Sequence, residues 1–363
     1  MSADEFEEEI DELDDQYYSA KGVAERLSVL DEIIRKADAA EHVPAGYHYR
    51  MQLIHDATFH GYQQRALVAF SWCLAQFDKE PDDFDLDELL WRYKWIVGNI
   101  HAYPQVARSK IESLLDDMER RFDEAGYSQR AVHGLRLGNT IHIGDFETAD
   151  EAFALWKKSK TDFMTDCRAC EENRVVEYFA SKEEDEAALK QATKLFDGKL
   201  TCAEVPHITV GHVVRPHMRT GQTDKVKELH RTWYPRLQDN QEFFHPVSEL
   251  MLFWVAMGDL DLAKSMFEQH APWADTANQD RRLRFLLTAW QLFEKLAATQ
   301  SEVVVLVPQM MDIYESGGTY STADLSDWFL KESQAVACQF DKRNQNQYCS
   351  SWIDKTRKLV EQC

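Results

Sequence analysis

A motif that recurs about every forty residues is the strongest constraint on what this chain can fold into. Each copy is a turn followed five residues later by a small anchor residue, usually alanine, that opens an amphipathic helix pattern. The clearest copies are Gly61–Ala66, Ala102–Ala107, Gly144–Ala149, Gly221–Val226 and Gly258–Ala263. With weaker copies anchored at Ala24 and Ala187, successive anchors lie 37 to 42 residues apart. Repeats of this period are typical of solenoids, whose units pack against their neighbours.

Each repeat is predicted to contain two helices. An apolar first helix, such as Ala131–Ile143, precedes the turn, and an amphipathic second helix, such as Phe146–Lys157, follows it. In the second helix the anchor Ala149 and the bulky Phe153 lie one turn apart on the same face. The turn glycine suits the left-handed residue that ends a helix. We therefore expect an all-α fold, an α-solenoid of about seven to eight helix pairs, with a further copy near residue 304.

The Gly-Asp-Phe/Leu-x-x-Ala pattern at 144–149 and 258–263 resembles the second half of the tetratricopeptide-repeat (TPR) consensus. Trp91 and Leu53 fall where the first helix of that family often carries Trp and Leu. The units here exceed the 34 residues usual for the family and mostly lack its proline, so they are degenerate repeats. The resemblance covers roughly residues 20–315. It implies stacked TPR-like helix pairs whose first helices line a concave, partner-binding face.

The two ends of the chain differ from the repeat array, which we place at 21–315. Residues 1–20 are strongly acidic, yet four apolar side chains recur at helical spacing: Phe6, Ile10, Leu13 and Tyr17. This pattern predicts an acidic amphipathic capping helix, the alternative being a disordered acidic arm. At the other end, 321–363 is predicted to form two capping helices, Ser321–Phe340 and Gln345–Cys363.

Charge and composition exclude several classes of function. The chain carries 41 Lys and Arg against 63 Asp and Glu, a formal net charge of −22. Phosphate backbones and anionic lipid surfaces would repel it, so we expect neither nucleic acid nor membrane as a partner. No run approaches the ~20 apolar residues of a membrane span, and the acidic start is unlike a secretory signal. Seven cysteines make a disulfide framework unexpected, which favours a cytoplasmic location.

One cluster of residues carries metal-binding chemistry. Cys167, Cys170, Cys202 and His207 follow the spacing C-x2-C-x31-C-x4-H, a ligand set suited to tetrahedral zinc. Cys167 and His207 also occupy equivalent positions in adjacent repeats, which would bring them together. The segments 166–170 and 202–207 are similar to D-C-x-A-C and C-x-E-V-P-H segments of bacterial TPR-like proteins. Four protein ligands would make this a structural zinc that clamps two repeats; ordinary core cysteines and a redox pair are the alternatives.

The repeat register also suggests which side chains face a partner. Counting from the anchors places eight residues on the concave side of the first helices: His48, Met51, His55, Arg92, Asn99, His142, Arg215 and Arg219. These side chains could hold a peptide backbone or carboxylate, or be ordinary solvated polar residues. With no recognisable catalytic set, we expect a non-catalytic protein- or peptide-binding scaffold or adaptor. A peptide-responsive regulatory sensor and a metal-dependent enzyme are the alternatives, and the oligomeric state stays open.

Overall fold

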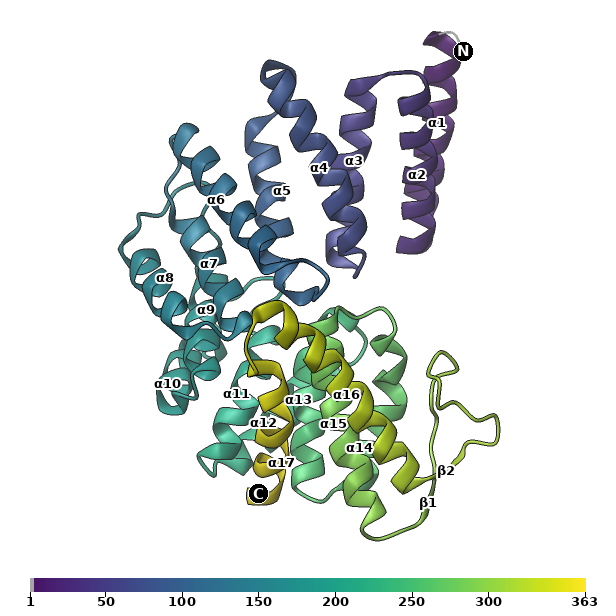
Figure 1. Ribbon diagram of the computed structural model, residues 1–363, viewed down its shortest axis with the longest axis vertical. Helices are drawn as coiled ribbons and strands as arrows, with labels where there is room; N and C mark the ends of the chain where they lie inside the picture. Colours follow the sequence, from purple (N-terminus) through teal and green to yellow (C-terminus); the bar gives the residue numbers. More distant parts are fainter. Residues whose placement is uncertain (1–2) are drawn as a thin grey trace.

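The computed structural model describes residues 3–363, and it confirms an all-α, solenoid-like architecture (Figure 1). Within these residues there are seventeen α-helices, which pair antiparallel along the chain. The first four pairs are α1 (Ala3–Ser19) with α2 (Val23–Ala39), α3 (Val43–Phe59) with α4 (Gln63–Lys79), α5 (Leu86–Asn99) with α6 (Arg108–Glu124), and α7 (Arg130–Ile143) with α8 (Phe146–Lys158).

The second half continues the same scheme and adds one helix. Its pairs are α9 (Arg168–Ser181) with α10 (Asp185–Phe196), α11 (His207–Arg219) with α12 (Thr223–Leu237), α13 (Phe244–Ala256) with α14 (Leu260–His270), and α15 (Gln279–Ala297) with α16 (Thr322–Asn344); α17 is Tyr348–Gln362. Four short 3-10 turns lie between helices: η1 (Pro81–Asp83), η2 (Ile100–Ala102), η3 (Gln241–Phe243) and η4 (Ala271–Ala274). None of the described helices is long and apolar enough to cross a bilayer.

The turn between α7 and α8 shows why the sequence forms helix pairs. Gly144 ends α7 with a φ of +83°, a left-handed conformation that favours glycine. The Asp145 carboxylate then caps α8 by accepting a hydrogen bond from the backbone N–H of Thr148 at 3.2 Å. The predicted anchor Ala149 is fully buried, which lets α8 approach α7 closely.

The predicted anchor residues are buried in some repeats, and in others they are not core residues or a neighbouring residue is buried instead. Ala66, Val226 and Ala263 are fully buried, as Ala149 is. Ala24 and Ala107 are not core residues; Ala107 is the residue before α6, and Ala24 is exposed. In α10 the buried alanine is Ala188, one residue after the predicted position. These copies lack a turn glycine or have a longer loop, so the helix begins at a different distance from the turn.

The prediction of a further repeat copy near residue 304 is wrong. Strands β1 (Glu302–Val304) and β2 (Thr319–Ser321) pair antiparallel there, with Val303 opposite Tyr320. The run Val303–Val305 consists of β-branched residues, which favour extended backbone over helix. The second helix of this pair is instead α16, which overlaps the predicted capping helix Ser321–Phe340.

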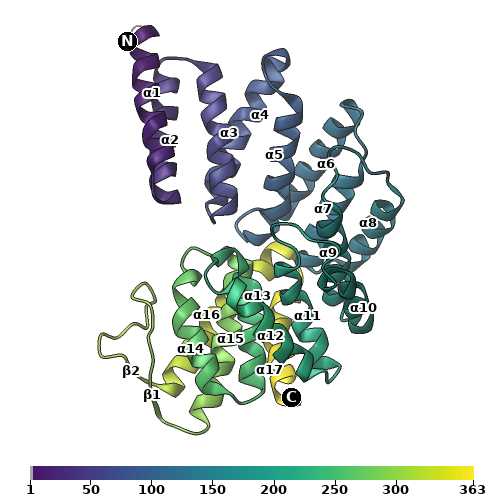
Figure 2. The same cartoon turned by 180° about the vertical axis from the view of Figure 1, so that it is seen from behind.

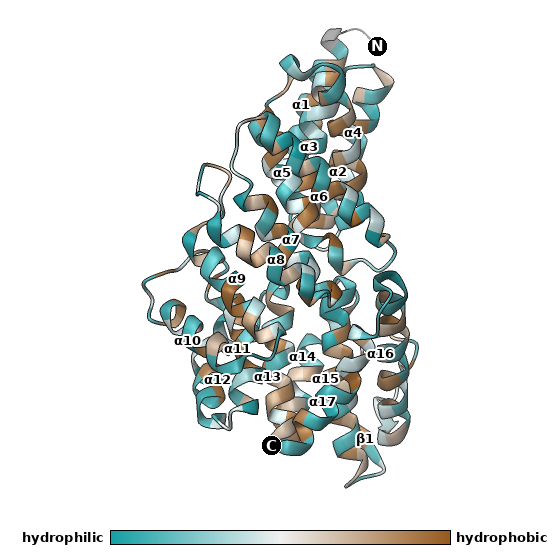
Figure 3. Cartoon of the chain, turned by 60° about the vertical axis from the view of Figure 1, so that its left-hand side comes forward, coloured by the Kyte–Doolittle hydropathy of each residue, from teal (hydrophilic) through white to brown (hydrophobic). Residues whose placement is uncertain are grey.

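The N-terminal helix α1 is amphipathic. Phe6, Ile10 and Tyr17 are buried against the following helices, and Leu13 is half-buried. The Phe6 ring stacks on His42 at a centroid distance of 5.0 Å. Most helices of the array carry both hydrophobic and hydrophilic residues along their length (Figure 3). This mixture is expected when one face of a helix packs and the other meets solvent.

The helix pairs form a curved array in which the first helices α5, α7, α9, α11, α13 and α15 contact one another in succession. The array bends between α6 and α11, so that α1–α6 and α11–α17 occupy opposite ends of the molecule (Figures 1 and 2). One large apolar core fills the C-terminal half and another fills the N-terminal half, with smaller clusters around α8 and α10.

The last helix, α17, packs across the concave side of the array, whereas a simple end cap would cover only the final helix pair. α17 packs on α11, α13 and α15. At the α16–α17 junction, the Arg343 guanidinium donates to the carbonyl oxygens of His101 at 2.9 Å and Tyr103 at 3.4 Å. The Asn346 side-chain amide donates to the carbonyl oxygen of Ile143 at 2.9 Å. These contacts join residues about two hundred positions apart and turn the concave face into a partly enclosed cavity.

Candidate metal centre and binding cavity

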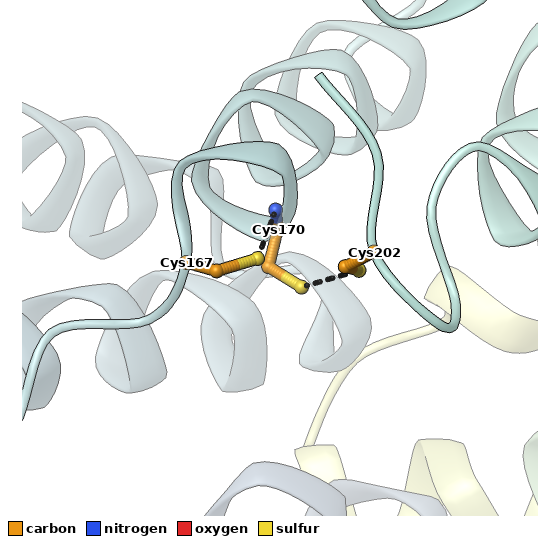
Figure 4. A group of neighbouring side chains, drawn as sticks. All are labelled: Cys167, Cys170 and Cys202. Atoms are coloured by element: carbon orange, nitrogen blue, oxygen red, sulfur yellow. Dashed lines mark hydrogen bonds between the residues drawn. The ribbon is translucent and has the colours of Figure 1, made fainter. Parts of the chain in front are cut away.

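Three of the predicted ligands come together at the start of α9. Cys167 is the residue before the helix, and its sulfur accepts a hydrogen bond from the Cys170 backbone N–H at 3.4 Å. Cys170 lies one turn on, and its sulfur is 3.5 Å from that of Cys202 (Figure 4). Cys202 belongs to the loop before α11, where its sulfur accepts from the Val205 N–H at 3.4 Å. All three sulfurs lie within 4.8 Å of one another.

This geometry fits a metal ion bound by thiolates. Tetrahedral zinc with Zn–S bonds of about 2.3 Å places its sulfurs about 3.8 Å apart. Here the Cys170 and Cys202 sulfurs are 3.5 Å apart, and all three sulfurs lie within 4.8 Å of one another. Burial, with the Cys167 and Cys202 sulfurs nearby, raises the pKa of the Cys170 thiol. A divalent cation would reverse this effect, because it binds and stabilises thiolates. The cysteine cluster, by which we mean Cys167, Cys170 and Cys202, could therefore hold a metal ion.

The predicted fourth ligand, His207, is not part of this cluster. Its ring stacks on Phe243 at a centroid distance of 5.0 Å and meets Trp233 edge-on at 5.4 Å. Burial lowers the pKa of His207. The equivalent repeat positions of Cys167 and His207 therefore do not bring these two side chains together, because His207 is held between aromatic side chains at the start of α11.

The cysteine cluster borders a large cavity inside the curve of the array. The cavity has a volume of about 1360 Å³ and is lined mainly by the first helices α5, α7, α9, α11, α13 and α15 and by α17. Of the described residues that line it, eight are Lys or Arg, seven are Asp or Glu, and five are His. A chain with a net charge of −22 thus has an interior surface on which cations slightly outnumber carboxylates.

A histidine between two carboxylates forms part of the cavity wall. His142 on α7 places Nε2 at 2.9 Å from Oε1 of Glu177 on α9 and Nδ1 at 3.6 Å from Oδ1 of Asp280 on α15. The His101 ring stacks on His142 at a centroid distance of 3.9 Å. Burial alone would lower the pKa of His142, but the neighbouring Asp280 and Glu177 carboxylates outweigh it and raise the pKa to about 9.

The carboxylates of this wall are held in their charged form by the same contacts. Burial would raise the pKa of Glu177, but the hydrogen bond from His142 brings it well below its usual range. Burial likewise opposes ionisation of Asp280, and Arg284, with Nε at 3.1 Å, outweighs it and lowers that pKa. The pKa of His101, unlike that of His142, is lowered, because burial and the neighbouring His142 disfavour its charged form.

A second buried carboxylate continues the network on α13. Glu249 is 1% exposed and lies 2.7 Å from Nε of Arg215, with Nη1 of Arg284 at 3.9 Å. The Arg215 guanidinium also donates to the Thr356 hydroxyl of α17 at 3.2 Å. We call Glu177, Glu249, Asp280 and the cations His142, Arg215 and Arg284 the ionic wall. It connects α7, α9, α11, α13, α15 and α17 across the concave face.

The residues predicted to face a partner divide into two sets. Four line the cavity: Asn99, His142, Arg215 and Arg219. Four do not line it: His48, Met51, His55 and Arg92. Met51 is a core residue at 3% exposure, and Arg92 lies over the Trp95 ring and pairs with Glu88 at 3.1 Å. His48 is exposed, and His55 contacts Asp56 at 3.0 Å.

Sequence reasoning did not find most of the ionic wall. The sequence pattern carries little sign of Glu177, Glu249, Asp280 and Arg284, because their partners lie up to 138 positions away and form no linear motif. One signal was present: Glu249 is an acidic residue within the otherwise apolar segment Phe244–Ala256. A carboxylate in the middle of such a helix requires a buried cation as partner.

Comparison with known proteins adds no further identification. No protein-family model matches the chain, and no curated protein matches it significantly.

Proposed function

We propose that this chain is a non-catalytic, TPR-like binding protein that takes a peptide, or an extended segment of a partner protein, into its concave cavity. The observation that carries the proposal is the cavity itself, which the first helices of six successive pairs and α17 surround. In solenoid proteins the concave face is the usual binding surface. We place this activity in the cytoplasm, where cysteines remain as free thiols able to bind a metal.

The size and chemistry of the cavity favour a peptide over a small apolar ligand. Its 1360 Å³ exceeds the roughly 300–1,000 Å³ of typical small-molecule sites. Its wall carries amide and charged side chains, such as Asn99 and Arg219, that can hydrogen-bond a peptide backbone or carboxylate. Because α17 closes one side, we expect a short peptide or a chain terminus to enter, and not a folded domain.

Zinc at the cysteine cluster is part of the same proposal. The three sulfurs have the spacing and softness that zinc prefers, and they join the start of α9 to the loop before α11. A bound ion would therefore brace two adjacent helix pairs at the edge of the cavity. It would also fix the position of the 197–206 loop, which has no α-helix or strand of its own.

A regulatory sensor is the second candidate, and one observation favours it. The α16–α17 junction touches η2 and the end of α7 through Arg343 and Asn346, far along the chain. A ligand that contacts both α5 and α17 would stabilise this closed arrangement relative to a more open one. Peptide binding would then change the curvature of the array.

Gly138 on α7 offers a direct test of the proposed site. It lines the cavity, and a Cβ built on it would meet no atom within 4 Å. Gly138→Trp should therefore fill part of the cavity without disturbing the fold. Gly138→Ala is the matched control, because it also replaces the helix glycine, with a gain of roughly 0.5–1 kcal/mol in helix propensity, but adds little bulk.

The measurement is affinity selection of a random-sequence decapeptide pool, followed by mass spectrometry of the retained peptides. Wild type and Gly138→Ala should retain the same peptides, and Gly138→Trp should retain far fewer. Lys190→Trp, which adds the same ring to an exposed position on α10, should bind as wild type. Equal retention by Gly138→Trp, or no retention by wild type, would contradict the proposal.

A further inference from the structure

The cysteine cluster differs from a closed structural zinc site in one respect. Structural zinc is almost always four-coordinate, whereas sites with three protein ligands keep a position for another molecule. Among the described residues, the cluster offers three ligand atoms within 4.8 Å of one another. All three cysteines also line the cavity that we propose to bind peptides.

Two neighbouring side chains that could complete the site are engaged elsewhere. His207 lies between Phe243 and Trp233. Asp166, next to Cys167 in the chain, forms ion pairs at 2.9 Å with both Lys94 and Arg174. Taking Asp166 to the metal would remove the carboxylate partner of the Lys94 ammonium, whose side chain is 4% exposed, and leave it with the Met164 carbonyl oxygen and the Trp91 ring.

We propose that the fourth ligand of a zinc ion at this cluster is a thiolate of the molecule in the cavity, so that the protein selects cysteine-bearing peptides. This inference rests on the proposed peptide-binding function and names the class of peptide. The incoming thiol releases its proton to solvent as its sulfur binds zinc, and no oxidation or reduction takes place. Zinc with three thiolates carries a net charge of −1, and the fourth makes it −2.

The charges around the cluster are arranged to accept this second negative charge. Lys94 and Arg174 both lie against Asp166, so two cations and one carboxylate adjoin the first cysteine. Across the described lining of the cavity, Lys and Arg outnumber Asp and Glu by eight to seven, and the protonated His142 adds a further cation. Soft thiolates are also the ligands that such a site holds best.

Cobalt substitution of the full-length protein tests the inference, because Co²⁺ reports its ligands in its absorption spectrum. The Co²⁺-loaded protein is titrated with glutathione, a tripeptide thiol, and with S-methylglutathione, which has the same shape but no free thiol. Glutathione should strengthen the sulfur-to-cobalt charge-transfer band and shift the visible bands, and S-methylglutathione should change neither. His207→Ala should show the wild-type spectrum before and after glutathione is added.

Four outcomes would overturn the inference. The bands could stay unchanged with glutathione, or change equally with both tripeptides, or differ in His207→Ala before any thiol is added. The cobalt content is measured after desalting, and loss of cobalt to glutathione would also count against a thiolate held at the site. If the cobalt test fails while the Gly138 variants behave as expected, peptide binding stands and the thiolate ligand does not.

Discussion

Replacing His142 with glutamine should weaken the loss of stability that accompanies a rise in pH from 6.5 to 9. In the folded protein its contacts with Glu177 and Asp280 raise the pKa of His142 from 6.5 to about 9. A raised histidine pKa stabilises the fold fully below the unfolded-state value, and this stabilisation is lost as pH rises through the folded-state value. At 1.36 kcal/mol per pKa unit, the contribution is about 3 kcal/mol at most.

The other histidines of the cavity wall with shifted pKa values act in a different pH range. The pKa values of His101, His212 and His245 are lowered by burial, so these rings are neutral in the folded protein. Their contribution is present above their unfolded-state pKa and is lost as pH falls below it. Between pH 6.5 and 9 the difference between wild type and His142→Gln therefore reports mainly on His142.

Guanidinium denaturation at pH 6.5 and pH 9 measures the effect, and a carbon-13 NMR titration of labelled histidines locates the pKa itself. Wild type should lose roughly 3 kcal/mol of unfolding free energy relative to the variant over this interval. His48→Gln, at an exposed position on α3, should keep the wild-type pH dependence. An equal slope in His142→Gln and wild type, or a His142 signal that titrates near pH 6.5, would refute the reasoning.

Two further substitutions test the packing that shapes the cavity. Phe267→Ala should lower the unfolding free energy by about 3–5 kcal/mol, since the ring is fully buried in the C-terminal core, and Phe163→Ala, at 69% exposure, should change it little. Gly144→Ala should lower the melting temperature more than Gly126→Ala; both have positive φ, but only at Gly144 would the added Cβ collide with the Tyr348 ring. Equal effects within either pair would contradict the contacts described here.

The repeat pattern predicted the local architecture because each helix pair is specified within about forty residues. Gly144 and Gly61, with φ of +83° and +86°, end their helices as the turn pattern indicated. The buried anchors Ala66 and Ala149 likewise needed no distant information. The hairpin at 302–321 was missed because an apolar run was matched to the repeat spacing without weighing its β-branched residues.

Long-range features could not be read from the repeats. The path of α17 across the concave face depends on contacts such as Arg343 with the carbonyl oxygens of His101 and Tyr103, which no local pattern encodes. The cysteine cluster was accessible because C-x-x-C is local and Cys202 lies at the equivalent junction of the next pair. The spacing of His207 does not reveal the direction in which its side chain points, and in the structure its ring lies against Phe243 and Trp233.

The metal content of the purified protein tests most directly the claim that a metal centre lies in the wall of the cavity. Inductively coupled plasma mass spectrometry of the untagged chain should find about one zinc per molecule. Cys170→Ser should lose it, and Cys338→Ser, an exposed cysteine on α16 outside the cluster, should keep it. Absence of metal from wild type, or full retention in Cys170→Ser, would contradict the account.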